Sequence, residues 1–171
     1  MTKEELLAKL PSVKAWIEQT LAGHVSRART ISSCGFGRLP HFYTAKLLAS
    51  AKVVEVERVP VPPLIAMGLP EFAEFVNGDY AGITYKDTYF LRAEAARDES
   101  IHFHELVHVV QWQHLGVDGF LMAYTQGLAQ FGYRESPLEQ MAYGLQAYFD
   151  QNGQPGDVEA AVRSKLSEMY R

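Results

Sequence analysis

The chain has 171 residues, of which 47% are hydrophobic and 21% charged, a balance typical of one globular domain with a real core. Its formal net charge is −4 and it has no block rich in Lys and Arg, so nucleic acid is not an expected partner. Cys34 is the single cysteine, which excludes a disulfide within the chain and favours a reducing compartment.

The first residues read Met-Thr-Lys-Glu-Glu-Leu-Leu-Ala-Lys-Leu and lack the uninterrupted apolar stretch of a signal peptide. Nowhere does the chain approach the roughly 18 consecutive apolar residues that a membrane-spanning helix needs. We therefore expect a cytoplasmic protein without a membrane partner.

The N-terminal part of the chain, about residues 1–80, is expected to contain helices and one clear strand. Leucines and alanines recur at helical spacing through residues 3–22, and Pro11 is expected to split this segment into two helical pieces. The other elements predicted here are a helix over residues 41–51, an alternating strand over 53–59, a short helix over 70–76 and a turn at 77–79.

A second clear strand is predicted over Gly82 to Leu91, immediately before the most apolar segment of the chain. Its residues alternate between two faces, the pattern typical of a strand. If this strand is the edge of a sheet, a peptide or protein substrate can bind along it by adding a strand. An ordinary internal strand is the alternative interpretation.

The C-terminal half is predicted to be helical. Residues 101–115 form an apolar run of helix length, with Asp98 or Ser100 as N-cap and Gly116 as the C-terminal stop. Further helices are expected over residues 120–131, about 136–149 and about 157–169. The order predicts an α+β fold, predominantly helical, with a small sheet of two to four strands before the helix of residues 101–115. We expect a single domain over residues 1–171, with its metal site in about residues 81–150.

Residues 104–108 read His-Glu-Leu-Val-His, the one motif of the chain that indicates a chemistry. Positions four apart share a helix face, so His104 and His108 can bind one ion together. Glu105 follows at a rotation of about 100°, close to the ion but not aimed squarely at it. Two imidazoles, an open water position and a carboxylate that accepts a proton suit a catalytic Zn²⁺. Imidazoles on a buried helix also need partners, which a metal provides.

A catalytic zinc ion needs a third protein ligand, and the preferred candidate is Glu139, at the start of a second helix. A competing interpretation makes Glu139 part of a capping box with Ser136, with Pro137 at the first helical position. Glu135, in the turn before this helix, is a second candidate, although solvation or pairing with Arg134 explains it more easily.

His114 is a third candidate, because it has the third-histidine spacing of metzincins. Those sites have a glycine where this chain has Gln111, so the helix is expected to continue and His114 to point away. His102 precedes His104 by two residues, on the opposite side of a helix. We expect His102 to cap the helix or to lie in the core rather than to bind metal.

The segment His104-Glu-Leu-Val-His-Val-Val-Gln-Trp-Gln-His-Leu-Gly116, followed by Gly132-Tyr-Arg-Glu-Ser-Pro-Leu-Glu-Gln-Met-Ala-Tyr143, resembles bacterial zincin-like metallopeptidases of the gluzincin type, in particular small DUF4157-like domains. The resemblance covers about residues 80–150. It implies a zincin-like fold in which the first helix gives two ligands and the general base, and the next helix gives the third ligand. These roles match His104, His108, Glu105 and Glu139.

Together these residues predict a zinc-dependent metallohydrolase, a peptidase or related amidase, with Zn²⁺ as cofactor and Glu105 as general base. The alternative is a non-catalytic zinc-binding domain that mediates protein interaction. Gluzincins usually add a residue that stabilises the oxyanion, and here the pattern matches no single residue. The candidates for this role are Tyr124, Tyr133, Tyr143 and Arg134.

Overall fold

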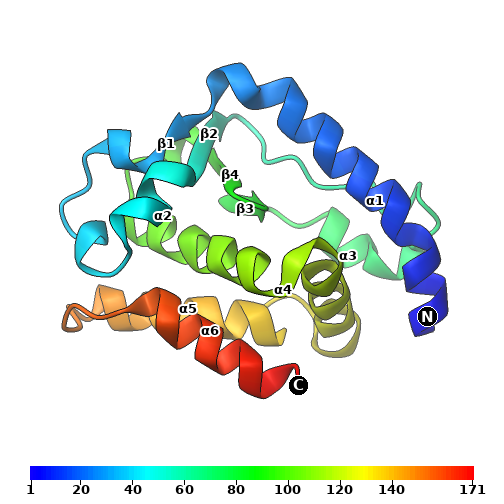
Figure 1. Ribbon diagram of the computed structural model, residues 1–171. Coiled ribbons are helices and arrows are strands. Elements are labelled where there is room, and N and C mark those ends of the chain that lie inside the picture. Colours follow the sequence, from blue (N-terminus) through cyan, green and yellow to red (C-terminus); the bar gives the residue numbers. More distant parts are fainter.

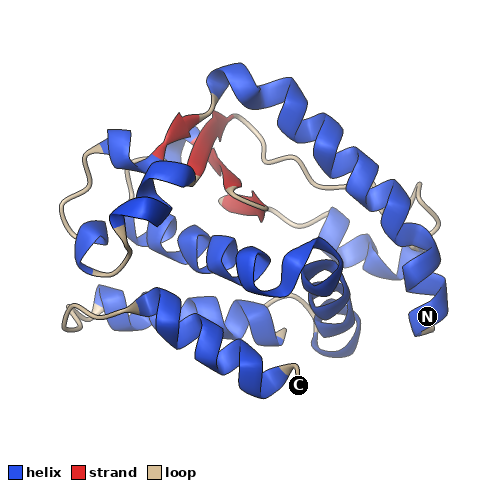
Figure 2. Ribbon diagram, in the orientation of Figure 1, coloured by secondary structure: helices blue, strands red, loops and turns tan.

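A computed structural model describes residues 1–171, with helices around a small four-stranded sheet (Figure 1, Figure 2). The strands are β1 (Arg29–Thr30), β2 (Lys52–Val56), β3 (Gly82–Tyr85) and β4 (Thr88–Arg92), in the order β1-β2-β4-β3. The central pair β2 and β4 is parallel, and the two outer pairs are antiparallel. β3 therefore forms one edge of the sheet.

The helices are α1 (Lys3–His24), α2 (Ala45–Ser50), α3 (Ala73–Val76), α4 (Glu99–Phe131), α5 (Pro137–Asp150) and α6 (Val158–Met169). α4 runs through the middle of the molecule, with α5 and α6 packed on the side away from the sheet (Figure 1). The chain is 63% helical and all four strands precede α4, so the predicted α+β, mostly helical fold is confirmed. None of the helices is long and apolar enough to cross a membrane.

The predicted break at Pro11 is wrong, because α1 continues through it as one helix of 22 residues. Pro11 lies on the exposed face, while the buried residues of α1 form a stripe on the opposite face. A proline inside a helix costs about 3 kcal/mol, and burial of several large aliphatic side chains exceeds that cost. The buried residues of the stripe are Leu6, Leu10, Val13 and Ile17.

The single strand predicted over Gly82 to Leu91 is also wrong, because these residues form a hairpin. β3 pairs with β4 in the register Tyr85↔Thr88, which leaves a two-residue turn at Lys86 and Asp87. Lys86 has a φ of 59°, a conformation that the turn requires and that glycine or asparagine would adopt more readily. Only β3 of the predicted strand is therefore available as a sheet edge.

The other predicted elements are present with shifted ends. The helix expected from residue 41 begins at Ala45, since the Thr44 hydroxyl accepts a hydrogen bond from the Leu47 amide at 3.2 Å. The strand expected over 53–59 is β2 and ends at Val56. Residues 70–76 form a 3-10 turn followed by α3.

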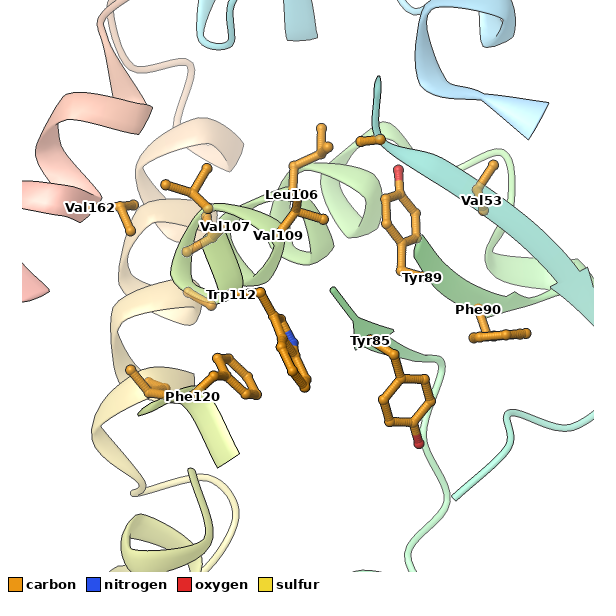
Figure 3. Packing of buried hydrophobic residues seen from close by; sticks show 14 of the residues in the cluster. Val53, Tyr85, Tyr89, Phe90, Leu106, Val107, Val109, Trp112, Phe120 and Val162 are labelled. Carbon is orange, nitrogen blue, oxygen red and sulfur yellow. The ribbon is translucent and has the colours of Figure 1, made fainter. Parts of the chain in front are cut away.

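Two predicted helices, residues 101–115 and 120–131, are the two halves of α4. Asp98 caps the first half, and Gly116 interrupts the helical backbone with φ 70° and ψ 172°. The change of direction stacks the Phe120 ring on the Trp112 ring at 4.0 Å between centroids (Figure 3). These rings join side chains of the sheet, such as Tyr85 and Tyr89, in one continuous core. The first half of α4 is consequently held rigidly, with its histidines inside the protein.

Candidate metal centre

Three side chains with metal-binding atoms meet between α4 and α5: His104, His108 and Glu139. The His104 and His108 Nε2 atoms lie 3.1 Å apart, and Glu139 Oε2 lies 3.3 and 3.4 Å from them. All three residues are at least 95% buried. The structure thus holds a buried His-His-Glu group that could hold a metal ion.

Two glutamines determine which ring nitrogen of each histidine carries a proton. Gln111 Oε1 lies 2.8 Å from His108 Nδ1, while its amide nitrogen donates to the Leu138 carbonyl at 3.0 Å. Gln146 Oε1 lies 3.0 Å from His104 Nδ1, while its amide nitrogen donates to Ser100 Oγ at 2.9 Å. Each Nδ1–H therefore donates to a glutamine oxygen, which leaves the two Nε2 atoms to face each other and Glu139.

Glu139 contributes a third electron pair to the same point. Its Oε2 is buried and accepts no hydrogen bond, whereas its Oε1 accepts one from the Tyr124 hydroxyl at 2.6 Å. Buried polar atoms without partners are rare and costly in proteins. A cation bound among the three side chains would give this oxygen and the two Nε2 atoms a common partner.

The pKa values of these groups also favour a positive charge among them. Burial alone would lower the pKa of His108, but the carboxylate of Glu139 raises this pKa to about 9. Burial would likewise raise the pKa of the Glu139 carboxyl, yet His108 and His104 hold it well below its usual range. The carboxylate is thus retained only with positive charge beside it, either a proton on His108 or a metal ion.

The distances between the donor atoms are compatible with a zinc ion. In a tetrahedral site with bonds of about 2.0–2.1 Å, neighbouring donor atoms lie about 3.3–3.4 Å apart. The three edges here measure 3.1, 3.3 and 3.4 Å. Two imidazole nitrogens and one carboxylate oxygen are also a donor set that zinc accepts in catalytic sites. The residues present therefore fit a zinc ion.

The start of α5 is placed against α4 by backbone features that involve no metal. A Cβ atom at Gly127 would lie 3.1 Å from Pro137 Cδ and 3.2 Å from Ser136 Cβ, so only glycine permits this approach without a shift. Ser136 makes no side-chain capping bond, and its hydroxyl donates instead to the Tyr133 carbonyl. The capping-box interpretation of Glu139 is consequently wrong.

Glu105 lies beside the three donor residues with its two oxygens in different surroundings. Oε2 accepts a hydrogen bond from Thr84 Oγ1 of β3 at 2.6 Å. Oε1 faces the backbone of Gly82, where a Cβ atom would be only 2.6 Å away. The edge strand β3 thus holds one carboxylate oxygen and leaves room for the other.

Two cavities meet at this carboxylate. The first, which we call the mouth, is lined by Ala81, Gly82, Ile101, His104, Glu105, Tyr133, Tyr143 and Gln146. The second, which we call the chamber, is largely apolar and reaches His108 and Glu139. Gly82, Glu105 and Tyr133 line both cavities. The candidate metal centre therefore has open space next to it on the Glu105 side.

The competing ligand candidates lie elsewhere. His114 is exposed, and its Nε2 lies 3.3 Å from Ser167 Oγ of α6. Glu135 is exposed in the turn before α5. His102 is buried in the core, as expected, with hydrogen bonds on both ring nitrogens.

Sequence reasoning missed the residues that support the site from other elements: Thr84, Gly82 and Gln146. Gln111 was considered only as a substitute for a glycine, although it orients the ring of His108. Its spacing of three residues from His108 on one helix could have indicated this contact. The contact of Gln146 with His104 spans 42 residues and has no local signal.

Comparisons of the chain with protein-family models, with curated proteins and with solved structures found no match.

Proposed function

We propose that the protein is a zinc-dependent hydrolase that cleaves peptide bonds or related amides. One observation carries this proposal: three buried lone-pair donors converge beside the Glu105 carboxylate, which borders two cavities. His104, His108 and Glu139 would hold the zinc ion. When bound, such an ion makes a coordinated water acidic and polarises a carbonyl oxygen.

The count of ligands favours catalysis over a purely structural site. Structural zinc ions are usually enclosed by four protein ligands, whereas catalytic ones leave a position open. Here the group contains three residues, and the remaining candidate carboxylate, Glu135, lies in solvent. A non-catalytic zinc-binding domain that mediates protein interaction is the alternative, and a closed shell would have favoured it.

Glu105 would act as the general base. Its Oε1 faces the space that both cavities share, while Oε2 is held by Thr84. In this role Oε1 accepts a proton from the attacking water and returns it to the nitrogen of the leaving group. The hydrogen bond from Thr84 keeps the carboxylate in one orientation through both transfers.

A peptide would bind along the edge strand β3. In the register with β4, the backbone groups of Gly82 and Thr84 point away from the sheet. The Thr84 carbonyl already accepts a hydrogen bond from the Trp112 indole at 3.2 Å, which leaves the backbone of Gly82 next to Glu105 for a substrate. Main-chain pairing at such an edge is a general mode of peptide recognition.

Among the candidates for stabilising the oxyanion, Tyr133 is the best placed. It lines both cavities, and burial raises its pKa, so its hydroxyl keeps a proton to donate. The Tyr124 hydroxyl already donates to Glu139. The ring of Tyr143 packs against His104, and its hydroxyl lies 3.5 Å from that of Tyr133. Arg134 is exposed beside the Tyr143 ring.

The test compares two variants, Glu105→Gln and His104→Ala, purified without chelators or a nickel column. Zinc content is measured by elemental analysis, and hydrolysis with a library of internally quenched peptides. Glu105→Gln is expected to retain one zinc per chain and to lose at least about 100-fold in turnover, whereas His104→Ala loses both. Glu168→Gln, which removes an exposed carboxylate of α6, serves as the control and behaves as wild type.

If Glu105→Gln cleaves peptides as fast as wild type, the proposed mechanism is wrong. If wild type binds zinc but cleaves no peptide, the non-catalytic zinc-binding domain is the better description.

A further inference from the structure

The hydroxyl of Tyr124 contacts the Glu139 carboxylate from a part of the chain outside the His-Glu-x-x-His motif. It donates a hydrogen bond of 2.6 Å to Oε1. No other hydroxyl or amide donates to this carboxylate, and Oε2 has no hydrogen-bond partner. The two oxygens of Glu139 therefore differ: Tyr124 holds Oε1, while Oε2 lies next to the Nε2 atoms of His104 and His108.

A break in α4 brings Tyr124 to this position. Tyr124 and His108 are 16 residues apart on α4, which in a continuous helix would separate them by about 24 Å. Their ring centroids instead lie 6.5 Å apart. Gly116, with φ 70° and ψ 172°, turns the second half of α4 away from the direction of the first (Figure 1). Because residues with a side chain disfavour this φ, the contact depends on a glycine at this point.

Aromatic packing fixes the ring of Tyr124 once the helix has turned. The Phe120 ring is stacked on it, with 5.4 Å between centroids and 16° between planes. The Phe75 ring meets it edge to face at 6.1 Å. Both arrangements are favourable for aromatic pairs. The hydroxyl is consequently held at Glu139 Oε1 by packing that does not involve the metal ligands.

This hydrogen bond affects how many oxygens Glu139 can offer to a zinc ion. A carboxylate binds a metal through one oxygen or through both. If both oxygens of Glu139 bound, the ion would have four protein donor atoms in place of three, and a water or substrate oxygen would bind less tightly. Oε1 could join Oε2 on the ion only by giving up the hydrogen bond from Tyr124. Hydrogen bonds to metal-binding carboxylates are a general means of orienting them.

We infer that Tyr124 is a positioning residue that restricts Glu139 to one metal-binding oxygen, Oε2, so that the ion keeps three protein donor atoms and an open position. This inference rests on the proposed zinc hydrolase function. It gives the second half of α4, which holds none of the metal ligands, a role at the site.

The test uses cobalt(II) in place of zinc and measures coordination rather than turnover. Cobalt binds to zinc-type donor sets, and its visible absorption is strong with four donor atoms and weaker with five. The cobalt protein is then titrated with azide, an anion that binds at an open coordination position. For wild type, we expect the strong absorption and a change in the spectrum when azide binds.

Tyr124→Phe removes the hydroxyl and keeps the packed ring. We expect one cobalt ion per chain, absorption about threefold weaker because both Glu139 oxygens bind, and azide affinity at least about tenfold lower. Tyr148→Phe is the matched control, because Tyr148 lies on α5, is 45% exposed and donates a hydrogen bond of 2.7 Å to the Gln154 carbonyl. It should behave as wild type. Thermal unfolding of each variant verifies that it is folded.

Unchanged absorption and azide affinity in Tyr124→Phe would overturn the inference and leave the proposed hydrolase intact. Loss of cobalt from this variant would also overturn it, since the hydroxyl would then be needed for metal binding itself. The expected spectra without peptide hydrolysis by the zinc form would support the role of Tyr124 and contradict the hydrolase proposal. A wild-type cobalt protein that binds no azide would contradict both.

Discussion

Helix α4 buries histidines in two different environments within two turns of each other. His102 has a partner on each ring nitrogen: Nε2 donates to the Ala96 carbonyl at 2.8 Å, and Nδ1 accepts from the Tyr89 hydroxyl at 2.7 Å. Burial lowers the pKa of His102, so it stays neutral in the core. This histidine needs nothing further from its surroundings.

His104 and His108 are also buried, but only one nitrogen of each ring, Nδ1, has a hydrogen-bond acceptor. A glutamine oxygen accepts from each Nδ1, and each Nε2 faces the other ring and the bare Oε2 of Glu139. Burial alone therefore does not distinguish a metal ligand from a core histidine. The distinction comes from counting donors and acceptors, because only the second environment leaves electron pairs without a partner.

The largest expected effect that separates the two environments is that of zinc on stability. A ligand that binds only the folded state at 1,000 times its Kd adds about 4 kcal/mol to the free energy of unfolding. We expect this difference between zinc-buffered and chelator-treated samples in wild type and in His102→Gln, but not in His108→Ala. Urea unfolding followed by circular dichroism measures it.

In the same experiment, His108→Ala should weaken zinc binding by about 100-fold or more. Apparent zinc-binding energies of roughly 10–16 kcal/mol are shared among about four ligands, so one ligand accounts for a few kcal/mol. A stabilisation by zinc that survives in His108→Ala, or that disappears in His102→Gln, would reverse the assignment of the two environments.

The next effect concerns the glutamines that orient the rings. Gln111→Leu and Gln146→Leu should each weaken zinc binding by about 10- to 100-fold, because the hydrogen bond on Nδ1 fixes the tautomer that presents Nε2. Competition with a chromophoric chelator measures the affinity. Gln113→Leu is the matched control on an exposed position of α4 and should bind zinc as wild type does. Equal affinities in all three variants would show that the rings keep their tautomers without the glutamines.

A smaller effect concerns Glu105, because only one of its two carboxylate oxygens, Oε2, has a hydrogen-bond partner. Thr84→Val removes the hydrogen bond on Oε2, and we expect kcat for peptide hydrolysis to fall about tenfold with KM and zinc content unchanged. Thr84→Ser keeps the hydroxyl and should restore most of kcat. A parallel loss in both variants would assign Thr84 to packing of β3 instead of positioning the base.

Local patterns in the sequence predicted most helices and the sheet content, because helical periodicity and apolar runs are properties of neighbouring residues. They also singled out the three donor residues that the structure brings together, since His104 and His108 share a helix face and Glu139 starts the next long helix. The turn at Lys86 was missed because it contains neither glycine nor asparagine. The continuity of α1 was missed because burial of one face, which outweighs the cost of Pro11, is set by distant contacts.

The supporting contacts of the site were not predictable in the same way. Thr84 meets Glu105, and Gln146 meets His104, only because β3 and α5 pack against the first half of α4. Such contacts depend on the arrangement of elements in space and leave no spacing in the sequence. The packing of α1 against the chamber is another such contact, because α1 precedes the His-Glu-x-x-His motif by about 80 residues.

The smallest expected effect is the dependence of stability on pH that His102 contributes. In the unfolded chain a histidine has a pKa of about 6.5, and burial lowers the pKa of His102 in the folded protein. Below about pH 6.5, His102 therefore binds a proton in the unfolded chain but not in the folded protein. The free energy of unfolding consequently decreases as the pH falls. His102→Gln lacks this proton but can keep both hydrogen bonds through its amide. We expect the stability of wild type relative to His102→Gln to decrease by up to about 1.4 kcal/mol between pH 8 and pH 5.5, measured by urea unfolding in chelator. If the stability of wild type relative to His102→Gln instead increases as the pH falls, His102 carries a proton in the folded protein. The environment of His102 would then resemble that of His104 and His108 more closely than the hydrogen bonds indicate.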